Sequence, residues 1–253
     1  MDSTITRLYI KKMLFPGSRI FYLLVNRLKI ESDAVSVKIR FMKKLFILIA
    51  VVICILLLIK HKNMTWRQSI LKSIYPLIML KGKWFPGKKD IQLNEGNKQP
   101  AISFYSLQAT ANNGTLIDFS QWKGKKVLLV NTASDCGYTG QYEELEKIYQ
   151  QYKDKLVILG FPANDFKEQE KKDNAAIAEF CKVNYGVTFQ LMQKTHVVKG
   201  VSQHPVFQWL SQATQNGWCE QAPTWNFSKY LVNEDGVLVG FYSQNISPEK
   251  IFK

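Results

Sequence analysis

Hydrophobic and polar positions change their spacing several times in the second half of the chain, and these changes predict alternating strands and helices. Two continuous apolar runs, residues 127–130 and 156–161, are typical of strands that are buried on both faces of a parallel sheet. From Gln141, apolar residues recur every three or four positions, which predicts a helix. The same spacing predicts helices over 175–184 and 205–213.

Shorter apolar segments around turn-forming residues predict two β-hairpins. One hairpin joins segments 103–107 and 116–119, and the other joins segments 230–232 and 237–242. Strands that alternate with helices and end in a hairpin are typical of a thioredoxin-like α/β domain. We therefore predict an α/β fold of this type with an N-terminal β-hairpin.

The first half of the chain contains an apolar run over 45–59 that has basic residues at both ends. These 15 residues are fewer than the roughly 20 of an average membrane-spanning helix, although flanking lysines can extend the reach of a helix. No small-x-small cleavage site follows the run, so an uncleaved signal-anchor helix over 42–62 is favoured over a cleaved signal peptide. Residues 1–41 are then a loosely structured basic arm or a misassigned extension before Met42.

Residues 63–100 are expected to connect this anchor to the domain. Apolar residues at four-residue spacing predict an amphipathic helix over 66–80, lying either on the membrane or on the domain. The polar stretch 88–100 predicts a linker. The domain itself is expected to span 101–253.

Charge is distributed unevenly between the two parts of the chain. Residues 1–100 contain 19 Lys and Arg against 5 Asp and Glu, whereas residues 101–253 contain 15 of each kind. A nucleic-acid-binding domain carries its basic residues on its folded surface, so no nucleic-acid partner is expected. Basic residues beside an apolar segment favour a membrane surface instead. A short N-terminal tail favours a single-pass protein whose domain lies outside the cytoplasm, on the periplasmic side.

Cys136 occupies the break between the apolar run 127–130 and the helix that begins near Gln141. At a helix N-terminus, the dipole and the free backbone N–H groups favour a thiolate, so this cysteine is a candidate nucleophile. Its neighbours Asp135, Tyr138 and Thr139 are not typical of a core, which disfavours a purely structural thiol. Thr139 stands where a Cys-x-x-Cys motif would have its second cysteine, which excludes a disulfide across this turn.

The segment NTASDCGYT, residues 131–139, resembles the active-site signature of the glutathione peroxidase family. Three more segments are similar to motifs of that family and follow in the family's order: LGFPANDFKEQE (159–170), FCKVNYGVTF (180–189) and WNFSKYLV (225–232). The resemblance covers about residues 101–252. It implies a thioredoxin-like fold and an enzyme that reduces hydrogen peroxide and organic or lipid hydroperoxides.

Peroxide cleavage by a thiolate requires hydrogen-bond donors to the sulfur and to the leaving oxygen. Neutral donors suit this task because they bind an anion without titrating. The resemblance implies that Gln169, Trp225 and Asn226 are these donors and that Cys136 is the peroxidatic nucleophile. The product is a sulfenic acid, which a second thiol must reduce.

The resemblance to the thioredoxin-dependent branch of the family implies that Cys181 is the resolving cysteine. A core position on a helix is the alternative for Cys181. A disulfide requires Cα atoms within about 7 Å, so resolution would require the helix around Cys181 to unwind. Cys54 and Cys219 are expected to be bystanders.

The resemblance implies no prosthetic cofactor and no metal, with thioredoxin or a similar dithiol protein, or glutathione, as the reducing co-substrate. The insert of tetrameric family members has no counterpart before Trp225, so a monomer is expected.

Two other functions remain open at this point. One is a membrane-tethered thioredoxin-like disulfide reductase, against which Thr139 argues. The other is a non-enzymatic redox sensor that passes oxidation from Cys136 to a partner. A peroxiredoxin of the usual kind is less favoured, because Ala133 stands where such a protein has Thr.

Overall fold

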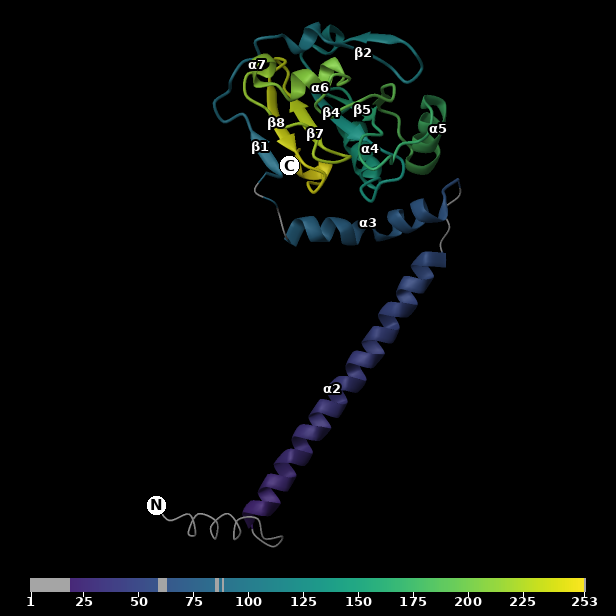
Figure 1. Ribbon diagram of the computed structural model, residues 1–253, viewed down its shortest axis with the longest axis vertical. Coiled ribbons are helices and arrows are strands. Elements are labelled where there is room, and N and C mark those ends of the chain that lie inside the picture. The colour runs from purple at the N-terminus through teal and green to yellow at the C-terminus, as the bar shows by residue number, and fades with distance from the viewer. Residues whose placement is uncertain (1–18, 59–62, 85–86, 88, 253) are drawn as a thin grey trace. The chain divides into compact units, whose positions relative to one another are not determined.

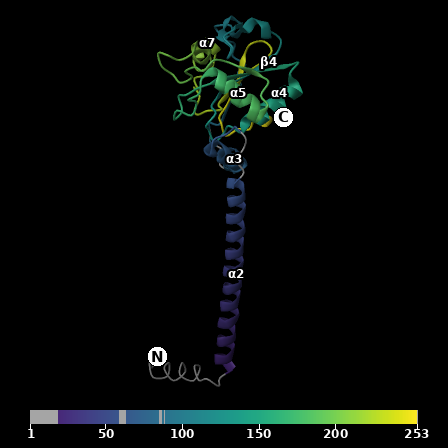
Figure 2. The same ribbon diagram turned by 90° about the vertical axis from the view of Figure 1, so that its right-hand side faces the viewer.

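The structure is a computed structural model that describes residues 19–58, 63–84, 87 and 89–252 (Figure 1). The chain divides into two compact units, Met1–Leu58 and Ile59–Lys253. The described part of the first unit is a single helix, α2 (Arg19–Leu58), which is unbroken in Figure 2. No Gly or Pro interrupts its sequence. Residues 19–41 belong to this helix, and residues 1–18 lie outside the described residues, so the interpretation of 1–41 as a basic arm or a misassigned extension stays a prediction.

The predicted membrane anchor over 42–62 is not supported. Across the described ranges, we find no helix with both the length and the apolar character needed to cross a bilayer. A spanning helix needs about 20 predominantly apolar residues, whereas the uncharged run is shorter and follows Lys43 and Lys44 directly. Residues 59–62 of the predicted anchor lie outside the described residues.

The second unit begins with α3 (Trp66–Trp84), a helix of 19 residues that includes Pro76. Thr65 and Gln68 form a reciprocal capping box: the Gln68 N–H donates to Thr65 Oγ1 at 3.2 Å, and the Thr65 N–H donates to Gln68 Oε1 at 3.0 Å. The predicted helix over 66–80 is thus confirmed and extends four residues further. Its side chains contact the folded domain, for example through Gln68 and Ser134.

The core of the domain is a six-stranded sheet in the order β1-β8-β7-β4-β5-β6, whose central strands lie side by side in Figure 1. Its strands are β1 (Ile91–Leu93), β4 (Lys126–Thr132), β5 (Leu156–Pro162), β6 (Gln190–Leu191), β7 (Lys229–Val232) and β8 (Leu238–Tyr242). β5 is parallel to β4 and β6, whereas β7 is antiparallel to β4 and β8. The two apolar runs therefore form the central parallel strands, as predicted.

Helices follow the parallel strands and leave apolar cores on both faces of the sheet. These helices are α4 (Gln141–Tyr152), α5 (Asn174–Tyr185), α6 (Pro205–Leu210) and α7 (Ala213–Asn216). Side chains of β4 alternate between the two cores: Val127 and Leu129 lie in one, and Leu128 and Val130 lie in the other. A β4–α4–β5 unit beside an antiparallel β7–β8 hairpin is the thioredoxin-like arrangement, which confirms the predicted fold.

Three predicted details are wrong. Residues 103–107 do not form a strand: Phe104–Ser106 is a 3₁₀ helix, because the Ser103 Oγ caps it by accepting from the Tyr105 N–H at 3.2 Å. The N-terminal hairpin is instead formed by β2 (Gln108–Thr110) and β3 (Leu116–Asp118).

The other two corrections concern the predicted linker and the helix over 205–213. β1 lies within the stretch 88–100 and pairs with β8, so the sheet begins before residue 101. The helix over 205–213 is divided into α6 and α7, because the Ser211 hydroxyl donates back to the carbonyl of Phe207 at 2.7 Å.

Candidate active site

Cys136 lies in the connection between β4 and α4, and its side chain is only 1% exposed. The backbone N–H of Tyr138 donates to Cys136 Sγ at 3.5 Å. Thr139 closes the loop: its Oγ1 accepts from the Cys136 N–H at 3.1 Å and contacts the Cys136 carbonyl at 2.6 Å. The residue that replaces the second cysteine of a dithiol motif thus has a structural task in the Cys136 loop.

The protonation of Cys136 differs from the sequence-based prediction. Burial raises the pKa of the Cys136 thiol above its usual value, and hydrogen bonds from the Tyr138 N–H and the side chains of Trp225 and Asn226 oppose this effect. The negative charge of Asp135 raises the pKa further. The predicted lowering of the pKa is wrong, because burial is the largest effect on the thiol, and Cys136 precedes Gln141, the first residue of α4, by more than the one turn over which a helix dipole acts.

Gln169, Trp225 and Asn226 come from two distant segments and meet beside Cys136. The Asn226 Nδ2 donates to Gln169 Oε1 at 3.0 Å. The ring of Phe166 lies 5.5 Å from that of Trp225, which ties the segment before Gln169 to the Trp225 turn. The structure therefore brings together the candidate nucleophile Cys136 and the three residues that were predicted from the sequence as its neutral donors.

Asn131 is a residue of this site that the sequence analysis did not select. It is fully buried on β4, where its Nδ2 donates to the Trp225 carbonyl at 3.0 Å and its Oδ1 accepts from the Ser228 N–H at 3.0 Å. Between these residues, Phe227 has a φ of 68°, in the left-handed region that side chains other than glycine rarely adopt. Asn131 thus holds a strained turn in place. Its position could have been noticed in the sequence, because it is a polar residue directly after the buried apolar run 127–130.

Glu170 fastens the Gln169 segment to the Cys136 loop. Its Oε2 accepts from the Ser134 N–H at 2.8 Å and from the Ser134 hydroxyl at 2.7 Å. The Asp135 N–H donates to the Gln169 carbonyl at 3.0 Å. Burial raises the pKa of the Glu170 carboxyl, and the two bonds from Ser134 oppose that rise.

Cys181 is not bonded to Cys136 in this structure. Both thiols are free, and Cys181 is fully buried within α5, where burial raises its pKa to about 12. α5 is capped at both ends: Asp173 Oδ1 accepts from the Ala176 N–H at 2.8 Å, and Gly186 ends the helix with a φ of 66°. Because Cys181 is held within a capped helix, we expect that α5 must open before it can form a disulfide with Cys136.

The other two cysteines are also free. Cys54 is exposed on α2, and Cys219 is buried with its thiol 3.9 Å from the Gln221 carbonyl. In the part of the chain that the structure describes, we find no cluster of His, Cys, Asp or Glu that could hold a metal ion.

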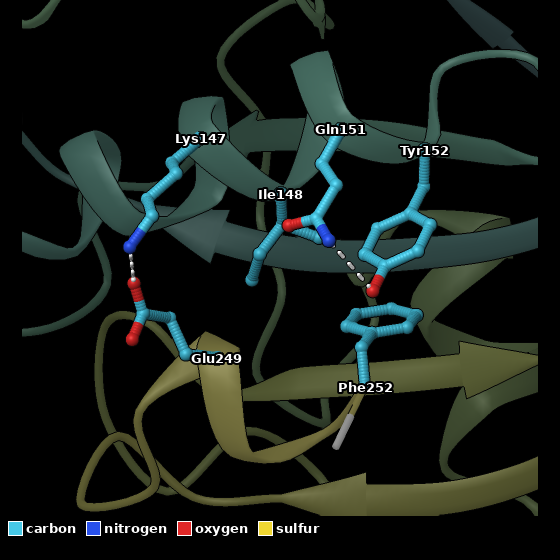
Figure 3. A pocket seen from close by; sticks show the side chains of 6 residues that line it. All are labelled: Lys147, Ile148, Gln151, Tyr152, Glu249 and Phe252. Atoms are coloured by element: carbon cyan, nitrogen blue, oxygen red, sulfur yellow. Dashed lines mark hydrogen bonds and ion pairs between the residues drawn. The ribbon is translucent and has the colours of Figure 1, made fainter.

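A cavity of about 170 Å³ lies between α4 and the C-terminal segment (Figure 3). Lys147 Nζ and Glu249 Oε1 form an ion pair of 2.6 Å at one end, and the Tyr152 hydroxyl accepts from Gln151 Nε2 at 3.0 Å at the other. None of the candidate site residues lines this cavity, so it is separate from the Cys136 site.

Comparison with known proteins matches the part of the chain that contains Cys136. The family model for glutathione peroxidase matches residues 104–211. A glutathione peroxidase of Lactococcus lactis subsp. cremoris is 43% identical over 151 residues, which covers 59% of this chain and 95% of that protein. A glutathione peroxidase-like peroxiredoxin of Schizosaccharomyces pombe is 47% identical over 150 residues, or 58% of this chain and 93% of that protein.

A solved structure, that of Trgpx in apo form, is 39% identical and covers 60% of this chain and 91% of that chain with a TM-score of 0.47. The sequence relatives are thus matched along nearly their whole length at an identity well above that of chance similarity. The chain belongs to the glutathione peroxidase family.

Proposed function

We propose that this protein is a thiol peroxidase that reduces hydrogen peroxide and organic or lipid hydroperoxides, with Cys136 as its nucleophile. The observation that carries the proposal is the convergence of neutral donors on one buried thiol, from the Tyr138 N–H and the side chains of Trp225 and Asn226. Such donors stabilise negative charge without titrating. Membership of the glutathione peroxidase family supports the same activity.

In the first step, the sulfur of Cys136 attacks one peroxide oxygen and the O–O bond breaks. The thiol proton passes to the other oxygen, which leaves as water or as an alcohol, and the sulfur becomes a sulfenic acid. Trp225 and Asn226 donate to the sulfur while charge develops there. The amide NH₂ of Gln169, whose oxygen is held by Asn226, is a donor for the leaving oxygen.

In the second step, we propose that the thiol of Cys181 attacks the oxidised sulfur of Cys136. An S–S bond forms, the S–O bond breaks, and the hydroxyl group leaves as water with the proton of Cys181. A thioredoxin-like dithiol protein then reduces the disulfide, with glutathione as the alternative reductant. Relatives described as glutathione peroxidase-like peroxiredoxins, in Schizosaccharomyces pombe and Saccharomyces cerevisiae, support a cycle of this kind.

The alternative functions fit the Cys136 loop less well. A disulfide reductase uses two thiols in this loop, whereas here Thr139 fills the second position and hydrogen-bonds the loop backbone. A redox sensor would use the same oxidation of Cys136 but would pass the disulfide to a partner protein, so it differs in the fate of the oxidised sulfur.

Oligomeric state and location rest on the sequence alone. We propose a monomer, because no counterpart of the tetramer-specific insert precedes Trp225. The periplasmic-side location stays a prediction, and the described helices do not support its membrane-spanning anchor. Light scattering of the purified full chain and fractionation of cells that produce it would test the two points separately.

The proposed function is tested with the full chain as wild type, Cys136→Ser, Cys181→Ser and, as a control, Cys219→Ser. Each protein receives hydrogen peroxide and either thioredoxin with its reductase or glutathione with its reductase, and NADPH consumption is followed. We expect turnover with thioredoxin in the wild type and in Cys219→Ser, and loss of turnover in the other two variants. Turnover with glutathione that survives Cys181→Ser would reject the two-cysteine cycle, and no turnover with either reductant would favour the sensor.

A further inference from the structure

Helix α3 precedes the region matched by the glutathione peroxidase family and packs on the Cys136 loop. Gln68 Nε2 donates to the Ser134 carbonyl at 3.2 Å, and Arg67 Nε lies 3.1 Å from Asp135 Oδ1. These contacts reach the two residues immediately before the nucleophile. The helix therefore covers the loop that must accept peroxide and, later, the second thiol.

The glycines of the loop show how closely α3 approaches. A Cβ atom placed on Gly137 would lie 3.1 Å from Ile78 Cδ1, and one placed on Gly140 would lie 2.4 Å from the ring of Tyr75. The hydroxyl of Tyr75 also hydrogen-bonds Glu144 on α4. α3 is therefore in direct van der Waals contact with the loop and with the beginning of α4.

One residue of α3, Lys72, reaches the end of the helix that carries Cys181. Its Nζ donates to the Asn184 carbonyl at 3.1 Å and forms an ion pair of 2.7 Å with Glu143 Oε1 on α4. The same ammonium group lies 4.6 Å from the centre of the Tyr185 ring. The Lys72 side chain is only 20% exposed, so these contacts are partly shielded from solvent.

The contact of Lys72 stabilises the last turn of α5. Carbonyl groups in the last turn of a helix lack intrahelical partners, and a cation there also complements the helix dipole. The same turn contains Cys181, whose own carbonyl accepts from the Val187 N–H at 3.3 Å. Release of Cys181 requires this turn to open, which separates Asn184 and Tyr185 from Lys72.

We infer that Lys72 is a positioning residue for the resolving step: by capping α5 it keeps Cys181 in its buried helical position and slows attack on oxidised Cys136. The inference rests on the proposed two-cysteine cycle. Lys72 takes no part in the chemistry of that step, in which the S–S bond forms, the S–O bond breaks and water leaves. The consequence is a longer-lived sulfenic acid at Cys136.

The test separates the two chemical steps in the full chain. Lys72→Met, Glu143→Gln and wild type are reduced, mixed with one equivalent of hydrogen peroxide and quenched with an alkylating reagent at short times. Mass spectrometry then gives one rate constant for oxidation of Cys136 and another for disulfide formation. The matched control is Lys153→Met, which removes an exposed lysine just after α4.

We expect Lys72→Met to form the disulfide about three- to tenfold faster than wild type, the range expected for loss of an ion pair and a hydrogen bond to a charged group. Glu143→Gln should change the same rate in the same direction but less, because the contacts of Lys72 with α5 remain. The oxidation rate should be unchanged in both, and Lys153→Met should match wild type. Hydrogen exchange of the α5 amides should be faster in Lys72→Met.

The inference is overturned if Cys136 is oxidised normally while disulfide formation in Lys72→Met and Glu143→Gln is no faster than in wild type. Should Lys72→Met fail to fold, Lys72→Gln, which keeps a polar side chain at this position but removes the charge, takes its place in the same comparison. A wild-type protein in which the sulfenic acid never joins Cys181 would instead reject the two-cysteine cycle itself, and this inference with it.

Discussion

The side-chain amide of Asn131 donates to the backbone carbonyl of Trp225 at 3.0 Å, so the central strand β4 directly positions the turn that approaches the nucleophile. The same side chain accepts from the Ser228 N–H, and the Asn131 carbonyl accepts from the Phe227 N–H at 2.6 Å. Three bonds to one turn offset the unfavourable positive φ of Phe227. The placement of Trp225 and Asn226 beside Cys136 thus depends on Asn131.

Replacement of Asn131 by alanine should therefore affect both stability and catalysis. The variant loses two buried hydrogen bonds, although the Trp225 carbonyl still accepts from the Ser228 hydroxyl at 2.9 Å, so the free energy of unfolding should fall by about 1–3 kcal/mol. The rate constant for Cys136 oxidation should fall about tenfold or more, because the donors lose their position. Denaturant unfolding and stopped-flow oxidation measure the two effects. The control Asn113→Ala, in an exposed turn, should change neither by much, and a normal oxidation rate in Asn131→Ala would contradict the role given to this residue.

The pH dependence of Cys136 oxidation should follow from the burial of the thiol. Burial raises the pKa of Cys136 above its usual value, so the thiolate fraction and the oxidation rate should both rise from pH 7 to pH 9. Trp225→Phe removes a donor that opposes this rise, so its profile should shift to higher pH. Stopped-flow measurements with hydrogen peroxide over this range provide the check. A rate that is already independent of pH above 7 would show that the thiol is ionised despite its burial.

Lys229 should make stability depend on pH. It is fully buried, and its Nζ donates to Gln141 Oε1 and to the Phe227 carbonyl, both at 2.7 Å. Burial lowers its pKa to about 7, so between pH 7 and about 10.5 the unfolded lysine binds a proton that the folded one does not. The stability that deprotonated Lys229 contributes is therefore fully present above the pKa of the unfolded lysine, about 10.5, and is lost as the pH falls through the pKa of the folded lysine, about 7.

We therefore expect Lys229→Met to remove a rise of stability with pH. Guanidinium unfolding of both proteins at pH 7, 8 and 9 measures the effect. The free energy of unfolding of wild type minus that of the variant should increase with pH, by at most about 1.4 kcal/mol per unit. A difference that is constant with pH would mean that the folded lysine keeps its proton throughout.

The contact between α3 and the Cys136 loop can be measured with a double-mutant cycle. Gly140 has helical backbone angles, φ −57° and ψ −20°, so alanine suits its backbone, but the new Cβ would meet the Tyr75 ring at 2.4 Å. Gly140→Ala should lower the free energy of unfolding by about 1–3 kcal/mol through overpacking. In a Tyr75→Ala background this loss should largely disappear. Equal losses in both backgrounds would mean that α3 does not pack on the loop in solution.

Local sequence patterns were sufficient for the regular elements with strong signals. The apolar runs 127–130 and 156–161 became β4 and β5, and the helix predicted over 175–184 is α5, one residue longer at each end. Short strands with weak sequence patterns were not predicted where their formation depends on pairing with a distant segment of the chain. β1 is a three-residue strand whose hydrogen-bond partner, β8, lies far along the chain.

The candidate site shows the same division. Cys136, Gln169, Trp225 and Asn226 were selected from their motifs, and the fold brings them together, whereas Asn131 was missed because its task is to hold a turn that lies far along the chain. The sign of the pKa shift of Cys136 was also missed, because burial depends on every segment that packs around the thiol.

The sequence by itself determined the order of the main strands and helices, the family, and the thiol that is the candidate nucleophile, since these follow from local periodicity and short motifs. Only the tertiary structure decided that this thiol is buried, that Asn131 holds the Trp225 turn, and that α3 packs on the domain with Lys72 at the end of α5. The burial of a side chain and its hydrogen bonds to distant segments arise only when the chain packs. A single sequence does not show which distant segments will come into contact.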